Sequence, residues 1–487
     1  MYHMAKRVDR YERQEKKRVL LINRFSTRTL AILAIHVLFF LFIVMADGLN
    51  YSAKVSLFAF LSAMTLWITT KIPAGFVAIS LIVFIVFMKA GEPELLYHSF
   101  GEDVVWLMLG SFVIGEAIKE SGLAERFSHA MVNRAKNKNF IVRAFTYTLG
   151  ISAFFIPSTS GRAALSMPII KQLGVYFSDK EREVLAVLAP VIILMSTSAT
   201  LIGAGSHLIG VGLLETASGE SISFIQWLIW GVPFTITITL LTMYIIKLLL
   251  WPKTAATDRQ LTSLNQTAAQ LKRPMSLKEK KTVVLLVALI IGWVAENVHG
   301  YEIAFVTIIG SLLFMLPHYG VISWKKGINA VSWNLLLFVA AATALGKVLV
   351  DSGVVGYIEK EMIGVLHLFM GVPEWVIVLL ILFVTVTSHL YITSHTTRAI
   401  VFVPSLLLFG QTIGAEPAAV VFLSLIGMNY CVTFPVSSKA LLLYYEEGEI
   451  TYDARHLLKI SIVLMPLYML VMLLFYFTYW KWTGLSI

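Results

Sequence analysis

The stretch that decides the fold is Ser158-Thr159-Ser160-Gly161-Arg162-Ala163, because the chain contains a second version of it, Ser394-His395-Thr396-Thr397-Arg398-Ala399. Six residues after each arginine comes a proline, Pro168 in the first version and Pro404 in the second. The serines, the arginines and the prolines are each 236 residues apart. The chain therefore carries an internal repeat, with hydroxyl groups and one arginine at corresponding places.

Both versions of the motif lie in hydrophobic sequence. Of the 487 residues, 57% are hydrophobic and 14% are charged, a balance that excludes a soluble globule with a polar surface. Apolar stretches long enough to cross about 30 Å of hydrocarbon, at about 1.5 Å per residue, recur throughout, so the spans are helices and not barrel strands. A single cysteine excludes a disulfide framework. The sequence predicts an all-α polytopic membrane protein.

About eleven membrane spans are predicted, two of them broken. They cover residues 29–46, 53–70, 73–88, 104–119, 183–214 (broken), 224–250, 282–298, 302–317, 332–350, 417–446 (broken) and 457–480. Two re-entrant hairpins lie between them, at 139–177 and 372–410, with the repeated motif at their tips. Irregular backbone at membrane depth survives only beside protein or a wet cavity, so these tips predict a buried or water-filled site.

A basic segment, residues 1–28, precedes the first span, and the net charge of the chain is +10. A nucleic-acid patch is one interpretation of such a segment. A basic segment joined directly to a first span is instead typical of a cytoplasmic anchor, and most other basic loops fall on the same side. We expect a multi-pass protein of the plasma membrane with a cytoplasmic N-terminus, no cleaved signal peptide and no nucleic-acid partner.

The repeat divides the chain into two related halves. The predicted parts are a cytoplasmic N-terminal segment (1–28), first scaffold helices (29–103), repeat 1 (104–251), a cytoplasmic linker (252–281), second scaffold helices (282–331) and repeat 2 (332–487). Amphipathic segments at 123–138 and 354–369 are expected to lie along the membrane surface. Because repeat 1 begins outside and repeat 2 inside, the repeats are inverted, an arrangement that supports alternating access in transporters.

The hairpin tips are the predicted substrate site. Its residues are Ser158, Thr159, Ser160, Gly161, Arg162, Ser394, His395, Thr396, Thr397 and Arg398. Two opposed tips direct hydroxyl donors and helix N-termini at one small volume, which suits an anion. A guanidinium inside a membrane costs several kcal/mol and marks a pathway or a paired charge, so two of them predict a doubly charged ligand. The structural alternative is that each arginine pairs with a carboxylate or snorkels along its hairpin.

The two broken helices supply a second pair of corresponding segments, 196–207 and 429–439. Ser206, Ser437 and Ser438 extend the predicted substrate site. The predicted cation site, or its cation substitute, comprises Thr200, Gly203, Gly205, His207, Thr433, Pro435 and Lys439. Glycine and proline end the helices and free carbonyl groups that can coordinate a cation, although closely packed membrane helices also use such glycines. Neither a cofactor nor a certain metal site is predicted.

With these motifs the chain resembles the divalent anion:sodium symporter family (DASS, similar to solute carrier 13), from about residue 50 onward. Members carry two Ser-Asn-Thr motifs at opposed hairpin tips and two unwound helices that end in a Thr-Pro-Pro-Asn-like loop. Residues 158–160 and 394–396 fall on the first pair, and residues 205–207 and 437–439 fall on the second. The resemblance implies a homodimer, an elevator-type movement of a transport domain along a scaffold, and C4 dicarboxylate substrates such as succinate or malate.

The chain departs from the family where sodium-coupled members bind their ions. The four asparagines of the family motifs are replaced by Thr159, His395, His207 and Lys439, and Phe154 and Leu390 stand where small hydroxyl residues are usual. Neutral oxygen ligands suit sodium, whereas imidazole, ammonium and apolar groups do not. We therefore expect sodium-independent transport, by anion exchange or by proton coupling through His207 or His395, with Lys439 as a substitute cation.

Several alternatives stay open at this point. A sodium-coupled di- or tricarboxylate or sulfate symporter is the first, since arginine binds any of these oxyanions. An anion channel is the second, although broken helices in inverted halves fit alternating access better than a continuous pore. Arsenite and sodium/proton carriers of distantly similar architecture are the third. An intramembrane enzyme is not expected, because no span carries an activated nucleophile, paired carboxylates or a metal motif.

Overall fold

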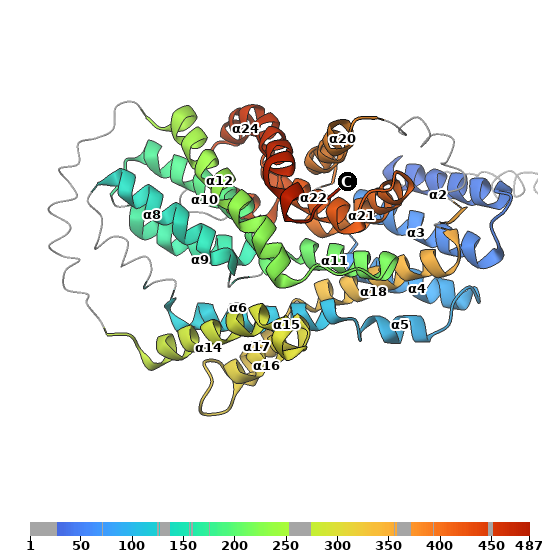
Figure 1. The fold of residues 1–487 in the computed structure, drawn as a ribbon, viewed down its shortest axis with the longest axis horizontal. Helices are drawn as coiled ribbons and strands as arrows, with labels where there is room; N and C mark the ends of the chain where they lie inside the picture. Colours follow the sequence, from blue (N-terminus) through green and yellow to red (C-terminus); the bar gives the residue numbers. More distant parts are fainter. Residues whose placement is uncertain are drawn as a thin grey trace, which may run out of the picture.

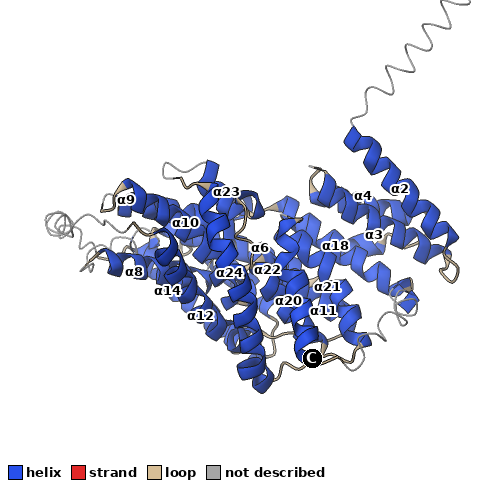
Figure 2. Ribbon diagram, turned by 90° about the horizontal axis from the view of Figure 1, so that it is seen from above, coloured by secondary structure: helices blue, strands red, loops and turns tan. Residues whose placement is uncertain are grey.

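The computed structural model describes residues 27–487 except 71, 124–125, 127–136, 155, 157–158, 175, 253–273, 355, 358–371, 393 and 447–450. All regular structure in these residues is helical, as Figure 2 shows. The predicted all-α class is confirmed. The basic N-terminal segment and most of the two predicted amphipathic segments lie outside the described residues.

Helices occupy every predicted span. The first four spans correspond to α2 (Thr27–Met45), α3 (Tyr51–Thr69), α4 (Ala74–Phe87) and α6 (Asp103–Ser121). The three spans after the linker correspond to α14 (Leu277–Val294), α16 (Ile303–Met315) and α18 (Trp333–Asp351). Three short helices join them without having been predicted, α5 (Glu94–Ser99), α15 (Glu296–His299) and α17 (Trp324–Ala330). They are too short to give a periodic apolar pattern.

The end of the predicted linker is helical. Ser276 accepts a hydrogen bond from the backbone of Glu279, and the Glu279 carboxylate accepts one from the backbone of Ser276. Such a capping box satisfies N–H groups that a helix leaves unpaired at its start. As a result α14 begins at Leu277, four residues before the predicted end of the linker at 281.

Both predicted hairpins have two helical arms. The first consists of α8 (Lys138–Ile151), the 3-10 turn η1 (Ser152–Phe154) and α9 (Thr159–Gly174). The second consists of α20 (Glu374–Thr387), the turn η6 (Ser388–Leu390) and α21 (His395–Thr412). Residues 159–163 and 395–399 of the repeated motif therefore lie in the first turns of α9 and α21, where an unwound tip was expected.

Both predicted broken helices are interrupted. The first runs through α10 (Asp179–Ser196), η2 (Thr197–Ala199), η3 (Leu201–Gly203) and α11 (Gly205–Ser218), and α12 (Phe224–Leu250) follows it. The second runs through α22 (Pro417–Asn429), η7 (Pro435–Ser437) and α23 (Lys439–Glu446), and α24 (Ala454–Phe475) follows it. The non-α-helical segments are residues 197–204, the first break, and 430–438, the second break.

The two repeats pack crosswise. The hairpin arm α9 contacts α23 of the second broken helix, and the hairpin arm α21 contacts α11 of the first. Figure 1 shows α6 and α14–α17 in one row, with α8–α12 and α20–α24 above them and α11 beside α18. The candidate site is thus assembled from both halves of the chain.

Four helical segments of the described chain are long and apolar enough to cross a membrane by themselves, by length and composition. They are Asp179–Ala199, Phe224–Leu250, Trp333–Asp351 and Ala454–Thr483. Among the shorter apolar helices, Glu374–Leu390 is a hairpin arm and Pro417–Asn429 is half of a broken helix. The interruptions explain why these two are short, as expected for helices that end at membrane depth.

Two glycines allow the first break to fold tightly. A Cβ atom on Gly203 would lie 2.2 Å from the carbonyl oxygen of Thr197, within the break itself. A Cβ atom on Gly231 of α12 would lie 2.2 Å from the carbonyl oxygen of Ser198. Atoms cannot approach that closely, so only glycine permits the loop to close on itself and to lie against α12.

Candidate functional site

Four helices begin close to the two breaks: α9 at Thr159, α11 at Gly205, α21 at His395 and α23 at Lys439. Their first N–H groups have no partner within the helix, and the helix dipole makes these ends partially positive. Two of the helices, α11 and α23, begin directly after a break, and the other two begin at the hairpin tips. The arrangement therefore supports the predicted anion site where the two repeats meet.

Arg162 projects from the first turn of α9 and is 1% exposed. Its Nη1 donates to Ser196 Oγ at 3.1 Å and its Nη2 to Thr197 Oγ1 at 2.7 Å. These hydroxyls lie where α10 ends, the negative end of that helix dipole. Nε is buried without a protein partner among the described residues.

Arg398 occupies the corresponding place in the second repeat and is fully buried. Its Nη1 donates to the backbone oxygen of Tyr430 at 3.3 Å, directly after the end of α22. Nε and Nη2 have no protein partner within the part of the chain that the structure describes. The Arg398 guanidinium, which lies beside the Cys431 thiol, therefore has two donors without a hydrogen-bond acceptor among these residues.

Neither arginine forms an ion pair among the described residues. The alternative in which each guanidinium pairs with a carboxylate is thus not what the described residues show. A buried cation without a counter-charge is costly, so such a site favours an anionic ligand.

The hydroxyls of the two tips differ in exposure. Ser394 is exposed and caps α21, where its Oγ accepts from the Thr397 N–H at 3.3 Å and lies 3.0 Å from Thr396 Oγ1. Thr397 is 4% exposed. In the first repeat Thr159, Ser160 and Gly161 are half-buried in the first turn of α9, and Ser158 lies outside the described residues.

The serines that follow the breaks are buried. Ser206 in α11, Ser437 in η7 and Ser438 at the end of the second break are at most 3% exposed. Ser438 Oγ accepts from the Ala440 N–H at 3.2 Å and so caps the start of α23. Ser437 Oγ has no partner among the described residues, which leaves one buried hydroxyl available beside the site.

His207 is fully buried and braces the first break. Its Nδ1 lies 3.1 Å from the Thr200 carbonyl oxygen and its Nε2 lies 3.0 Å from Asn429 Oδ1. Its ring packs on Trp227, with centroids 4.6 Å apart. Thr200, also fully buried, donates its hydroxyl to the Ala153 carbonyl oxygen of the first hairpin at 2.9 Å. His207 and Thr200 therefore stabilise the conformation of the first break.

The second break is braced by a histidine that the sequence did not single out. His389 Nε2 lies 2.7 Å from Thr433 Oγ1, and His389 Nδ1 lies 2.6 Å from the Val386 carbonyl oxygen. His389 stands 236 residues after Ala153, which makes the equivalent contact in the first repeat. The constant separation of the repeat was the signal that could have identified it.

The remaining predicted residues surround the second break. His395 is half-buried, and its Nε2 lies 3.0 Å from Cys431 Sγ. Pro435 is half-buried and begins η7, whereas Lys439 is exposed at the start of α23. Leu390, one of the two apolar residues that the family resemblance places at the ion sites, is 45% exposed. These positions supply no cluster of neutral oxygen ligands.

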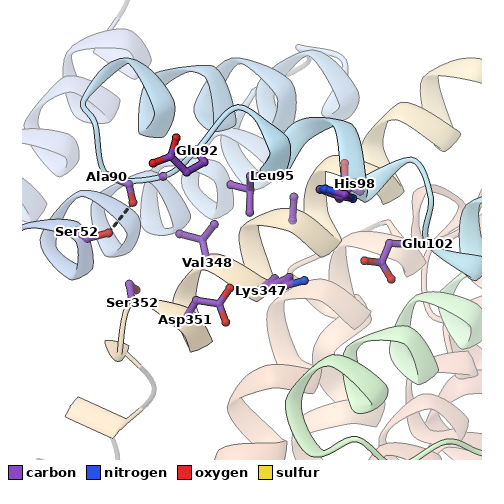
Figure 3. Close-up of a pocket in the computed structure, with 13 residues that line it drawn as sticks. Ser52, Ala90, Glu92, Leu95, His98, Glu102, Lys347, Val348, Asp351 and Ser352 are labelled. Carbon is purple, nitrogen blue, oxygen red and sulfur yellow. Dashed lines mark hydrogen bonds between the residues drawn. The ribbon is translucent and has the colours of Figure 1, made fainter.

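Cavities lie between several of the described helices. An apolar cavity of about 230 Å³, bordered by Arg162 and Ser166, lies among α6, α8, α9 and α14. A larger one of about 660 Å³ separates α11 from α6 and α16 and includes His98, Lys347 and several carboxylates. Its carboxylates are Glu102, Asp103, Glu215, Glu296 and Glu302. Figure 3 shows a third cavity, of about 320 Å³, where Lys347 lies between His98, Glu102 and Asp351.

The carboxyl group of Glu302, just before α16, lies in the larger cavity and has a raised pKa. Its carboxyl group hydrogen-bonds to that of Asp103, which together with burial raises the pKa of Glu302 to about 7. In the unfolded chain this carboxyl would titrate near its ordinary value, so between the two values the folded protein binds more protons. Stability associated with Glu302 is therefore fully present at low pH and is lost as the pH rises through about 7.

Glu302→Gln should remove this dependence. We expect the variant to have a higher melting temperature than the wild type at pH 8 and a difference that shrinks toward pH 5, because glutamine stays neutral. Thermal unfolding of the purified protein between pH 5 and 8 measures it. The same difference in melting temperature between Glu302→Gln and the wild type at every pH would contradict the prediction.

Comparisons with known proteins agree with this architecture. Residues 24–486 match the family described as "Sodium:sulfate symporter transmembrane region". The chain is 25% identical over 447 residues, 84% of each chain, to the sodium-dependent dicarboxylate transporter SdcS of Staphylococcus saprophyticus. It is 23% identical over 364 residues to the L-tartrate/succinate antiporter of Escherichia coli, covering 72% of this chain and 73% of the relative.

A solved structure shares the fold. The crystal structure of the Alcanivorax borkumensis YdaH transporter matches with a TM-score of 0.58 at 12% identity, covering 88% of this chain and 99% of that one. The match of residues 24–486 extends over nearly the whole sequence and confirms the family that the motifs predict. The chain is a multi-pass membrane transporter of the sodium:sulfate symporter family, and not an enzyme.

Proposed function

We propose that the chain is a secondary active transporter of C4 dicarboxylates, such as succinate or malate, which exchanges one dianion for another without sodium. The observation that carries this proposal is the pair of buried arginines, Arg162 and Arg398, at corresponding places in the two repeats and without carboxylate partners among the described residues. Two guanidinium groups complement two carboxylates, and arginine binds carboxylates through paired donors.

The same arginines support independence from sodium. In each repeat a guanidinium lies at the end of a helix that stops at a break, α10 for Arg162 and α22 for Arg398. The C-terminal end of a helix is partially negative and attracts a cation. A tethered guanidinium in this position supplies a charge that a coupling ion would otherwise bring. The geometry favours the arginines for this role over His207, whose nitrogens both engage the break.

Exchange agrees with one relative in particular. The L-tartrate/succinate antiporter of Escherichia coli exchanges two dicarboxylates by its printed name, whereas SdcS is described as sodium-dependent. A carrier with permanently charged arginines in place of ions gains no driving force from a sodium gradient. It returns across the membrane best with a second anion, because an empty site would leave both guanidinium charges without a counter-charge.

We further propose how the chain works as a whole. The hairpins, the broken helices, α12 and α24 form a transport domain that moves along the scaffold helices in an elevator mechanism, within a homodimer. The plasma membrane is its proposed location, with the basic N-terminus in the cytoplasm. The crosswise packing of α9 on α23 and of α11 on α21 supports this division, since it joins parts of both repeats into one unit.

A ligand panel tests the substrate class. The melting temperature of the purified protein is measured with succinate, malate, citrate, sulfate and phosphate, with choline as the only added cation. A ligand that binds the folded state raises the apparent stability. We expect succinate or malate to raise it most and to support counterflow in proteoliposomes. Stabilisation by sulfate or citrate alone would overturn the proposed substrate class.

A further inference from the structure

A buried asparagine joins the two breaks. Asn429 is the last residue of α22 and is 1% exposed. Its Nδ2 donates to Ser198 Oγ at 2.9 Å, and its Oδ1 lies 3.0 Å from His207 Nε2. Ser198 lies within the first break and His207 directly after it. One amide of the second repeat therefore holds both sides of the break in the first.

This amide also connects the segments that hold the two arginines. Arg162 binds the hydroxyl of Thr197, the residue before Ser198. Arg398 binds the backbone oxygen of Tyr430, the residue after Asn429. The hydrogen bond between Ser198 and Asn429 thus connects the anchor of one guanidinium with the anchor of the other.

The repeat itself does not dictate this contact. At the separation of 233 residues that relates the ends of α10 and α22, the counterpart of Asn429 is Ser196, whose hydroxyl contacts Arg162 and the Ile193 carbonyl within its own repeat. The second break is likewise braced within its own repeat, by His389 and by Ser461, which lies 2.7 Å from Thr433 Oγ1. The link through Asn429 crosses between repeats, so it has a role that the local fold does not require.

This inference rests on the proposed function. We propose that Asn429 is a positioning residue that fixes the distance between Arg162 and Arg398, one from each half of the substrate site. With the amide in place, the guanidinium groups of Arg162 and Arg398 keep fixed relative positions before the ligand binds. Without it, a dianion must order the first break as it binds, and that ordering lowers affinity. The expected signature is a raised KM with little change in Vmax.

The test uses full-length Asn429→Leu, which keeps a similar volume and removes both polar contacts. Succinate counterflow in proteoliposomes should show a KM on the order of ten- to a hundredfold higher, because Ser198 and His207 lose a buried partner. Ser198→Ala should raise KM by itself, and the double variant should be no worse than Asn429→Leu, since both remove the same link. An unchanged KM alongside a lowered melting temperature would reduce Asn429 to a structural role and overturn the proposal.

A second measurement needs no ligand and separates this proposal from the proposed function. Hydrogen exchange of residues 197–204 in the apo protein should be faster in Asn429→Leu than in the wild type. Thr433→Val, which breaks the brace of the second break, is the matched control and should leave 197–204 unchanged. If the wild type fails to exchange succinate, the proposed function fails, while this contrast still tests the link. Unchanged protection of 197–204 in Asn429→Leu would overturn the inference.

Discussion

Arg398→Ala should lower succinate uptake at low substrate concentration by about a hundredfold or more. The guanidinium is fully buried and keeps Nε and Nη2 free of protein partners among the described residues. Hydrogen bonds to charged groups contribute about 1.5–3 kcal/mol each, and about 1.4 kcal/mol corresponds to a factor of ten in affinity. Two such bonds to a carboxylate account for the expected loss. Initial rates of counterflow in proteoliposomes measure it.

Two further variants show whether the loss concerns the ligand. Arg398→Lys keeps the charge and loses the planar fork, so it should recover only part of the uptake. Arg162→Ala should cost more stability than Arg398→Ala, since Arg162 already donates to two hydroxyls of α10 and η2. Wild-type uptake by a folded Arg398→Ala protein would show that this arginine is a structural residue.

Lys138→Met should lower the free energy of unfolding by about 3–5 kcal/mol, the usual cost of breaking a buried ion pair. The Lys138 ammonium donates to both oxygens of Glu181, at 2.9 and 3.1 Å, where α8 and α10 begin. The two side chains are only 10% and 0% exposed, so the substitution leaves a carboxylate buried without its counter-charge. Equilibrium unfolding in detergent micelles measures the change.

The control for this prediction is an exposed ion pair. Lys326 and Glu120 are 2.7 Å apart, with side chains 57% and 33% exposed. Surface pairs contribute about 0–1 kcal/mol, so Lys326→Met should have a small effect. Adding Glu181→Gln to Lys138→Met should restore much of the stability, because the amide oxygen can still accept from Ser178. Equal losses for Lys138→Met and Lys326→Met would contradict the account.

The sequence predicted the elements of this fold because their signals are local. Long apolar runs identify spans, and the repeated serine, arginine and proline identify two hairpins related by a constant separation. The predicted breaks followed from glycines, which destabilise a helix, and from Pro435, whose ring and missing N–H interrupt one. The start of α21 at His395 is set by Ser394, whose side chain caps that helix.

The site was harder to predict because its contacts join distant residues. The amide of Asn429 contacts Ser198, 231 residues away in the sequence, and the hydrophobic periodicity of the sequence does not predict such a pairing. His389 was overlooked because its partner Thr433 lies in another element, although the constant separation of the repeat relates His389 to Ala153. The arginines were found because a charge in an apolar segment is conspicuous. The structure was needed to show that the arginines contact helix ends and not carboxylates.

Sodium-independent exchange is tested most directly by the uptake of labelled succinate into proteoliposomes with and without a sodium gradient. Vesicles preloaded with unlabelled succinate should take up label at the same rate in sodium and in choline, since the Arg162 and Arg398 charges replace the coupling ion. Empty vesicles should take up almost none, even with sodium outside. Uptake into empty vesicles that rises with the sodium gradient and disappears in choline would contradict the central claim.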